Sequence, residues 1–186
     1  MAYTDLNCKF KKIGKNVEIG RNVYFRYPDL IEIGDNVIID DFCYFTAALQ
    51  IESFIHIGPH CSIIGGKLGK LIMENFSGLS AGCRIICSSD DYLGSGLTNP
   101  TIPEKYHAEV KHTTIIIQKH AVLGTNTIVH PGITIGEGSA IGSGSLVTKN
   151  TEPWSVYRGV PAIKVKERDK DKILQNEFQF LKDYHK

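Results

Sequence analysis

The sequence lacks the features that mark a membrane, secreted or nucleic-acid-binding protein. None of its apolar stretches approaches the roughly 20 residues that a membrane-spanning helix needs. The opening segment, MAYTDLNCKFKKIGKN, has no apolar core of a secretory signal. Lys and Arg total 21 against 20 Asp and Glu, and an excess of one positive charge is too small for binding a phosphate backbone. We therefore expect a cytoplasmic protein without a membrane span and without a nucleic-acid partner.

The cysteines are too few, and odd in number, for a framework in which all of them form disulfide bonds. Five cysteines without a secretory signal favour buried thiols in a reducing compartment. A chain of 186 residues fits one domain. A globular protein of this size buries roughly 70% of the surface of its extended chain, which is enough to form a hydrophobic core without disulfide bonds.

An apolar residue recurs at every sixth position along most of the chain. A helix does not place every sixth residue on one face, so the period indicates one short strand and one tight turn per hexapeptide. Coils of this kind pair with neighbours about 4.8 Å away. Gly and Asn at the turns supply positive φ angles at low steric cost. The runs are Ile117, Leu123, Val129, Ile135, Ile141, Val147; Ile33, Ile39, Phe45, Ile51, Ile57, Ile63; Ile13, Ile19, Phe25; and Met73, Leu79, Ile85, with turn residues Gly34, Asn36, Gly58, Asn126, Gly136 and Gly138.

This pattern resembles the left-handed parallel β-helix of the hexapeptide acyltransferase superfamily, in which three hexapeptides complete one coil. The left hand comes from the resemblance, because parallel crossovers in general are right-handed in about 98% of cases. With this coil length, Cys43 and Cys61 stack, and a four-residue insertion within 65–70 brings Cys83 into their column. We interpret the column as a ladder of small apolar side chains rather than a thiolate metal site.

The repeat is interrupted at three places, where a solenoid is expected to carry function. They are a slip at 27–29, the insertion at 65–70 and a loop at 88–113. The expected fold is all-β: a single-stranded left-handed parallel β-helix over residues 1–166, with the protruding loop 88–113 inserted, and a C-terminal α-helix over 167–186. The helix carries an apolar stripe, and we expect it to cap the open end of the solenoid rather than to bind the acceptor; the stripe is Ile173 or Leu174, Phe178, Leu181 and Tyr184.

The ending ITIGEGSAIGSGSLVTKNTEPWSVYRGVPAIKVKER resembles the acetyltransferase branch that includes galactoside, maltose and xenobiotic acetyltransferases. In that branch acyl-CoA lies in a groove between neighbouring subunits of a homotrimer. The resemblance therefore implies a homotrimer with acetyl-CoA as co-substrate and no metal. By position it implies contacts to the thioester arm (Gly124, Thr125), the pantetheine (Gly142, Ser143, Thr148, Lys149) and the nucleotide end (Ala162, Lys164, Lys166).

Acyl transfer from a thioester needs a group that takes a proton from the acceptor, and histidine suits this near neutral pH. Galactoside-type enzymes carry that histidine in the loop matching 88–92, and by position it becomes Asp90 here. The candidates are therefore His56 and His60 in SFIHIGPHCSIIGG, with Asp90 orienting the base, binding an amino group or acting as the base. We favour His56, which points outward from mid-strand. A backbone N–H would stabilise the oxyanion.

The segments DDYLGSGLTNPTIPEKYH and EPWSVYRGVPA are most similar to the bacterial subgroup that N-acetylates nucleotide-linked amino sugars, of the perosamine or 4-amino-4,6-dideoxyhexose type, for surface polysaccharides. An Asp pair suits an ammonium acceptor. Three alternatives remain. One is sugar O-acetylation of the galactoside or maltose type. A second is a zinc γ-class carbonic anhydrase using His107 and His112 with His60 or His130. The third is a non-catalytic scaffold.

Overall fold

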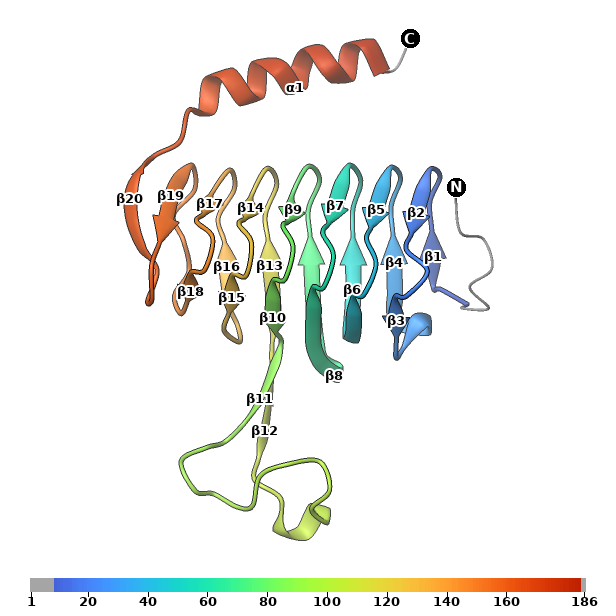
Figure 1. Cartoon of the computed structure of the whole chain (residues 1–186), viewed down its shortest axis with the longest axis vertical. Coiled ribbons are helices and arrows are strands. Elements are labelled where there is room, and N and C mark those ends of the chain that lie inside the picture. Colours follow the sequence, from blue (N-terminus) through green and yellow to red (C-terminus); the bar gives the residue numbers. More distant parts are fainter. Residues whose placement is uncertain (1–8, 185–186) are drawn as a thin grey trace.

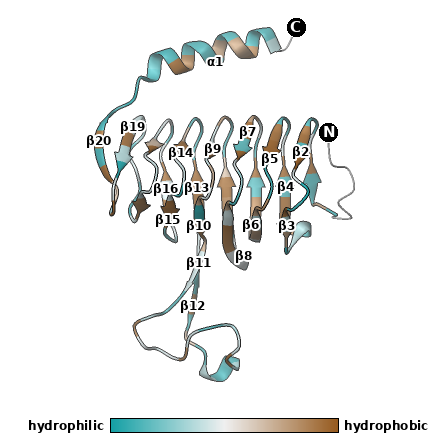
Figure 2. Cartoon of the chain, in the orientation of Figure 1, coloured by the Kyte–Doolittle hydropathy of each residue, from teal (hydrophilic) through white to brown (hydrophobic). Residues whose placement is uncertain are grey.

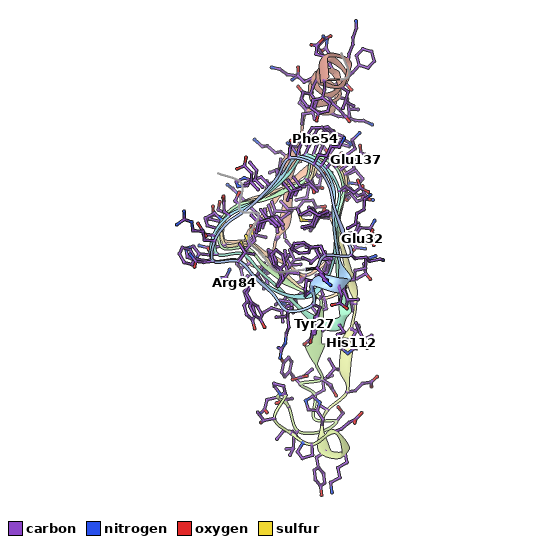
Figure 3. The ribbon with its side chains drawn as sticks, turned by 90° about the vertical axis from the view of Figure 1, so that its right-hand side faces the viewer. Tyr27, Glu32, Phe54, Arg84, His112 and Glu137 are labelled. Atoms are coloured by element: carbon purple, nitrogen blue, oxygen red, sulfur yellow. The ribbon has the colours of Figure 1, made fainter. Side chains whose placement is uncertain are left out.

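A computed structural model describes residues 9–184 and shows stacked coils that form a triangular prism (Figures 1 and 3). Each complete coil contributes one strand to each of three faces, and strands pair in parallel along a face. Face A contains β2 (Val17–Ile19), β5 (Val37–Ile39), β7 (Ile55–Ile57), β9 (Gly78–Leu79), β14 (Val122–Leu123), β17 (Ala140–Ile141) and β19 (Ser155–Arg158). Face B contains β3 (Tyr24–Phe25), the first halves of β6 (Tyr44–Ile51) and β8 (Ser62–Met73), β10 (Arg84–Ile86), β15 (Ile128–Val129) and β18 (Leu146–Val147). Face C contains β1 (Lys12–Ile13), β4 (Ile31–Ile33), the second halves of β6 and β8, β13 (Thr114–Ile117) and β16 (Thr134–Ile135).

The residues at every sixth position form the core of the prism. All members of the two long predicted runs are buried, whereas Ile13 at the first described coil is 51% exposed. The cysteine column is confirmed, since Cys43, Cys61 and Cys83 are at most 1% exposed. All three thiols contact main-chain oxygens: Cys43 that of Gly58 at 3.3 Å, Cys61 that of Ser80 at 3.2 Å and Cys83 that of Gly124 at 3.4 Å. The column therefore packs as small side chains in the core.

All three interruptions lie at the corner between faces B and C. The insertion is visible in the pairing of β6 with β8: Ala47 pairs with Gly66, but the next residue, Ala48, pairs with Lys70. The slip contains the short 3-10 helix η1 (Pro28–Leu30), and the loop begins and ends in the antiparallel ribbon of β11 (Ser88–Asp90) and β12 (Val110–His112), with η2 (Glu104–Tyr106) between them. We call residues 26–30, 65–69 and 88–113 the interrupted corner. The ribbon carries the loop away from the prism (Figure 1).

The C-terminal segment departs from the predicted cap. Strand β20 (Ile163–Glu167) pairs antiparallel with β19 and covers the edge of the last coil. Helix α1 (Lys170–Tyr184) then turns back and runs alongside the coils (Figure 1). The prediction that the helix caps the open end is wrong, because β20 takes that position. Residues 1–8 and 185–186 of the predicted domains lie outside the described part of the chain. No helix in residues 9–184 is long and apolar enough to cross a membrane.

Helix α1 lies on the corner between faces C and A, where four rings form a column. Three of them come from successive coils, and the fourth, Trp154, is separated from His120 by a coil that has Gly138 at this corner. Phe54, Phe76, His120 and Trp154 all have left-handed backbones, with φ of 60, 62, 60 and 54°. Their ring centroids are separated in turn by 4.9, 5.2 and 6.0 Å. Bulky residues rarely adopt this φ, so the turns predicted for Gly and Asn alone also accommodate stacked rings. We call these four residues the aromatic corner.

The amphipathic character of α1 is visible in its alternating hydropathy (Figure 2). Phe180 meets Phe54 edge-on at 5.2 Å, whereas Phe178 is 70% exposed. The predicted stripe is thus wrong at Phe178. A polar contact secures the same face, since Glu177 accepts hydrogen bonds from His120 at 2.9 Å and Lys119 at 2.5 Å.

Candidate active site

A hollow of about 420 Å³ lies at the interrupted corner, between the ribbon and the bulge of β8. In the antiparallel register, Ser88 faces His112 and Asp90 faces Val110. Alternate side chains of a strand point to the same side, so these four share one face of the ribbon. They line the hollow together with Gly65 and Gly66 of β8. The two largest interruptions of the repeat therefore build one site.

The two adjacent aspartates have different roles. The carboxylate of Asp91 accepts hydrogen bonds from the N–H groups of Leu93 at 2.8 Å and Ser95 at 3.3 Å. Bonds from the Ser95 side chain and the Leu93 N–H lower the pKa of Asp91. Asp91 thus closes a turn, while the carboxylate of Asp90 has no hydrogen-bond partner in residues 9–184 and lines the hollow. Only Asp90 of the predicted pair is available to a ligand.

His107 secures the loop from inside. Its Nδ1 lies 2.7 Å from the Ala108 oxygen and its Nε2 lies 2.9 Å from the Asn99 oxygen. A carbonyl only accepts, so both bonds form together only in the imidazolium. His107 therefore has no nitrogen free for zinc, and within residues 9–184 no three His, Cys, Asp or Glu side chains cluster as metal ligands.

His112 is held by two hydrogen bonds in series. Its Nδ1 lies 2.8 Å from Ser88 Oγ, and Ser88 Oγ donates to the Gly65 oxygen at 2.6 Å. From the sequence alone, His112 is a candidate only as a zinc ligand. A sequence signal exists, since Ser88 and His112 mark the two ends of the irregular segment, but it does not identify their pairing.

His56 and His60 lie elsewhere on the prism. His56 points outward from β7 on face A as predicted, with its side chain 57% exposed, and its Nε2 is 2.8 Å from Asp40 Oδ2. His60 lies at the corner between faces A and B and stacks on Phe42 at 5.0 Å. Within one chain the carboxylate that contacts His56 is thus Asp40 and not Asp90. The catalytic roles of His56, His60 and Asp90 stay predictions.

The residues predicted to contact CoA fall into separate groups. Gly124, Thr125, Gly142 and Ser143 lie together at the corner between faces A and B, which we call the glycine corner. A Cβ on Gly124 would lie 2.6 Å from the Ser143 nitrogen, so only glycine permits this approach of the coils. Thr148 and Lys149 follow β18 and lie at the other edge of face B. The set therefore borders face B on both sides.

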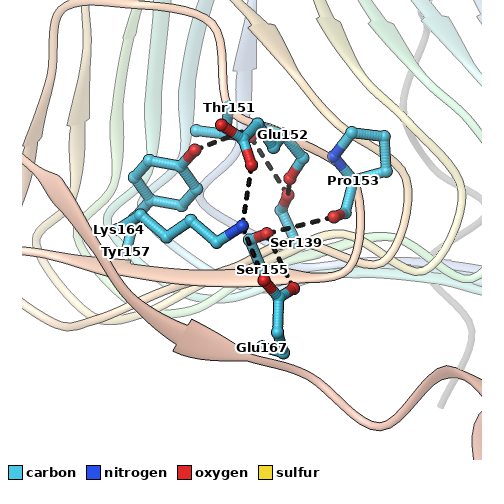
Figure 4. A network of polar contacts seen from close by, with 8 residues as sticks. All are labelled: Ser139, Thr151, Glu152, Pro153, Ser155, Tyr157, Lys164 and Glu167. Carbon is cyan, nitrogen blue, oxygen red and sulfur yellow. Dashed lines mark hydrogen bonds and ion pairs between the residues drawn. The ribbon is translucent and has the colours of Figure 1, made fainter.

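The third group lies on and beside β20. The Ala162 N–H donates to the Leu146 oxygen at 2.8 Å, which fixes the chain just before β20. Lys164 forms ion pairs of 2.7 Å with both Glu152 and Glu167 (Figure 4), and hydrogen bonds to these carboxylates raise its pKa. Lys166 has no ion pair in residues 9–184. Of the two lysines, Lys166 thus offers the uncompensated charge.

Comparison with known proteins agrees with this architecture. Residues 114–149 match the family model described as the hexapeptide repeat of succinyl-transferase. The chain is 38% identical to the dTDP-4-amino-4,6-dideoxy-D-glucose acyltransferase of Escherichia coli, over 97% of this chain and 95% of that protein. It superimposes with a TM-score of 0.89 on AntD, an N-acyltransferase from Bacillus cereus in complex with dTDP and 3-hydroxybutyryl-CoA, at 37% identity over 95% of this chain and 93% of that one. A single-residue mutant of AntD in complex with dTDP-4-amino-4,6-dideoxyglucose and coenzyme A gives a TM-score of 0.88 at 37% identity, over 94% and 91% of the two chains.

The stacked parallel coils together with these similarities define an acyltransferase built on a left-handed β-helix, which confirms the predicted fold and hand. The chain belongs to the hexapeptide-repeat acyltransferase family, in the group that contains the E. coli and B. cereus enzymes.

Proposed function

We propose that this protein transfers an acyl group from acyl-CoA to the amino group of a dTDP-linked 4-amino-4,6-dideoxy sugar. The observation that carries the proposal is the 38% identity to an enzyme of that name along 97% of the chain, which includes the 88–113 loop. We further propose that the reaction takes place in the cytoplasm and supplies a surface polysaccharide such as O antigen.

The chemistry of the hollow supports an amine acceptor. An amino sugar arrives as an ammonium, and a carboxylate without another partner binds such a group by a charge-assisted hydrogen bond. Asp90 is that carboxylate, in a hollow of about 420 Å³. This volume falls in the range of about 300–1,000 Å³ that small-molecule sites occupy.

We propose a homotrimer with acyl-CoA bound between subunits. Face B exposes apolar side chains that a neighbour could cover: Tyr24 and Tyr44, stacked at 5.0 Å and 49% and 46% exposed, and Ile64, 45% exposed. Exposed apolar patches of this kind are typical of interaction surfaces. We propose the glycine corner, which borders face B, as one part of the CoA site, and Lys166 of β20, which pairs with β19 beyond the last coil, as another. If His56 and Asp90 act in one site, the loop of one subunit reaches face A of the next.

The test is release of free thiol from acetyl-CoA and from 3-hydroxybutyryl-CoA, with dTDP-, UDP- and GDP-linked amino sugars as acceptors. The matched control replaces the amino group of each acceptor by hydroxyl. We expect release only with the amines, and most with the dTDP-linked 4-amino sugar. Release with the hydroxyl acceptors would support sugar O-acetylation instead, and no release with any acceptor would overturn the proposal. His56→Ala with unchanged turnover would exclude His56 as the base.

A further inference from the structure

We infer that His112 takes the proton from the acceptor's amino group, and that Ser88 and the main-chain oxygen of Gly65 hold its ring in the reactive tautomer. The inference rests on the proposed function and names the proton acceptor at that site. It names a different base from the sequence prediction of His56, which contacts Asp40 on face A and stays a prediction.

The hydrogen bonds fix the tautomer by counting protons. Ser88 has one hydroxyl proton, and it donates this proton to the Gly65 oxygen at 2.6 Å, because a carbonyl only accepts. The contact of 2.8 Å between Ser88 Oγ and His112 Nδ1 is then a bond donated by Nδ1–H. Neutral His112 therefore carries its lone pair on Nε2, which has no hydrogen-bond partner among the described residues.

Packing holds the start of this series in place. A Cβ on Gly65 would lie 2.8 Å from the Cys87 Cβ and 3.0 Å from the Gly69 Cα, so the bulge of β8 is in close contact with the adjoining coil. The accepting oxygen therefore has a defined position relative to Ser88. A hydrogen bond to one ring nitrogen fixes the tautomer and orientation of a histidine, so that its other nitrogen can act as a general base.

Among the titratable groups that line the hollow, His112 is the one that we assign as the proton acceptor. The remaining titratable side chains that line it are Asp90, Tyr92 and His107, and no Lys or Arg of residues 9–184 lines it. His107 has both ring nitrogens on main-chain oxygens. Asp90 shares the ribbon face with His112 and attracts the ammonium, so the carboxylate and the imidazole meet one acceptor group from neighbouring positions.

The reaction balances with these groups. The ammonium R–NH₃⁺ gives one proton to Nε2 of His112, and the freed lone pair forms the C–N bond at the thioester carbonyl carbon. The C–S bond then breaks, and its electron pair leaves with the sulfur of CoA. A second proton of the amine goes to that sulfur, and the imidazolium returns its proton to water. The products are the amide, CoA–SH and one proton.

The experiment compares wild type with His112→Asn, in which the amide NH₂ replaces the Nδ1–H donor to Ser88 while the base is lost. General-base catalysis contributes about 10²–10⁴-fold, so kcat should fall by that factor with KM for both substrates within about threefold. The decline of wild-type kcat/KM towards acid pH should be absent in the variant. Lys111→Ala, on the opposite face of β12, is the matched control and should retain wild-type kcat. A kcat of His112→Asn within threefold of wild type would overturn the inference.

Two further variants separate chemistry from folding. His112→Ala leaves space for a small base, so added imidazole should restore part of the lost kcat. A variant that has lost activity only by misfolding would not be rescued by imidazole. Absence of rescue in a folded His112→Ala variant would contradict the role of His112 as the base. Ser88→Ala should lower kcat about tenfold, as loss of an orienting partner does, while the acid decline is retained. If wild type itself releases no thiol, the proposed function fails; if wild type and His112→Asn are equally active, only the role of His112 fails.

Discussion

The hexapeptide repeat is regular at one corner of the prism and interrupted at another. At the aromatic corner the coils follow one another without insertion, four rings stack, and α1 covers them. At the interrupted corner the insertion in β8 and the 88–113 loop leave main chain and polar side chains around a hollow. Figure 3 shows both in one view, with Phe54 below α1 at one corner and Tyr27 and His112 beside the loop at another.

The difference shows how a solenoid separates stability from chemistry. A regular column places like side chains above one another, which favours stacking and provides a surface on which a helix can dock. An insertion removes that stacking and exposes hydrogen-bonding groups, which an active site needs. The two corners should therefore respond to substitution in different quantities, activity at one and unfolding free energy at the other.

The largest effect is expected at the interrupted corner. Asp90→Asn removes the charge that attracts the ammonium, and hydrogen bonds to charged groups contribute about 1.5–3 kcal/mol. We expect kcat/KM for the amino sugar to fall about 50-fold, with an unchanged melting temperature. Asp91→Asn is the control: it perturbs the turn at Leu93, and its effect should be smaller. Equal losses for both aspartates would show that loop order, and not the charge of Asp90, governs activity.

At the aromatic corner the largest effect should follow from Glu177→Ala. Glu177 is 10% exposed and His120 is 9% exposed, so the variant leaves a nearly buried His120 without its partner. Loss of hydrogen bonds to a charged group costs about 2 kcal/mol. Urea unfolding should show this loss, and kcat should be unchanged. A matching loss of activity would mean that the two corners are coupled.

The same contact predicts a response to acid. Burial raises the pKa of Glu177, but hydrogen bonds and charge from Lys119 and His120 outweigh it, and the net pKa lies below the usual 4.5. A lowered folded-state pKa stabilises the fold at pH values above 4.5, and this contribution is lost as pH falls through the lowered value. Helix content followed by circular dichroism from pH 6 to pH 3 should decline in wild type. Glu177→Gln should flatten the acid decline, and identical profiles would contradict the assignment.

A smaller contrast lies within the bulge of β8. A Cβ on Gly65 meets Cys87, Gly69 and Ala47 at 2.8–3.1 Å, whereas Gly66 has open space but a φ of 63°. Overpacking costs about 1–3 kcal/mol, and a left-handed non-glycine residue costs about 1 kcal/mol. Gly65→Ala should therefore lower the unfolding free energy more than Gly66→Ala. It should also lower kcat, because it displaces the oxygen that orients Ser88. The reverse order of stabilities would contradict the packing account.

The sequence predicts the regular part of the molecule well, because a period of six has few structural solutions. The buried runs, the cysteine column and the four-residue insertion follow from counting alone. The same counting predicts that residues of the aromatic corner stack. Phe54 and Phe76 are separated by one coil plus the insertion, and Phe76 and His120 by one coil plus the loop. This stacking was missed because left-handed turns predict Gly or Asn.

The site was harder to predict because its contacts join segments that the repeat does not place. The spacing of Gly65, Ser88 and His112 in the sequence does not predict their hydrogen bonds, because these bonds depend on the register of the ribbon. Likewise, the position of α1 depends on Glu177 meeting His120, and not on its apolar stripe alone. The motif at the chain's end predicted two lysines for CoA, but the sequence could not show that carboxylates hold one of them.

Those two lysines give the smallest expected effect and extend the comparison beyond the two corners. Lys164 is held by Glu152 and Glu167, whereas Lys166 lies two residues further along β20 without an ion pair in the described chain. A lysine whose charge is already compensated attracts a phosphate less. Lys166→Ala should therefore raise KM for acyl-CoA about threefold, and Lys164→Ala less. The use of dephospho-CoA thioesters sharpens the test, because the effect of Lys166→Ala should vanish when the 3′-phosphate is absent. A larger effect at Lys164 would indicate that its carboxylate partners release it when CoA binds.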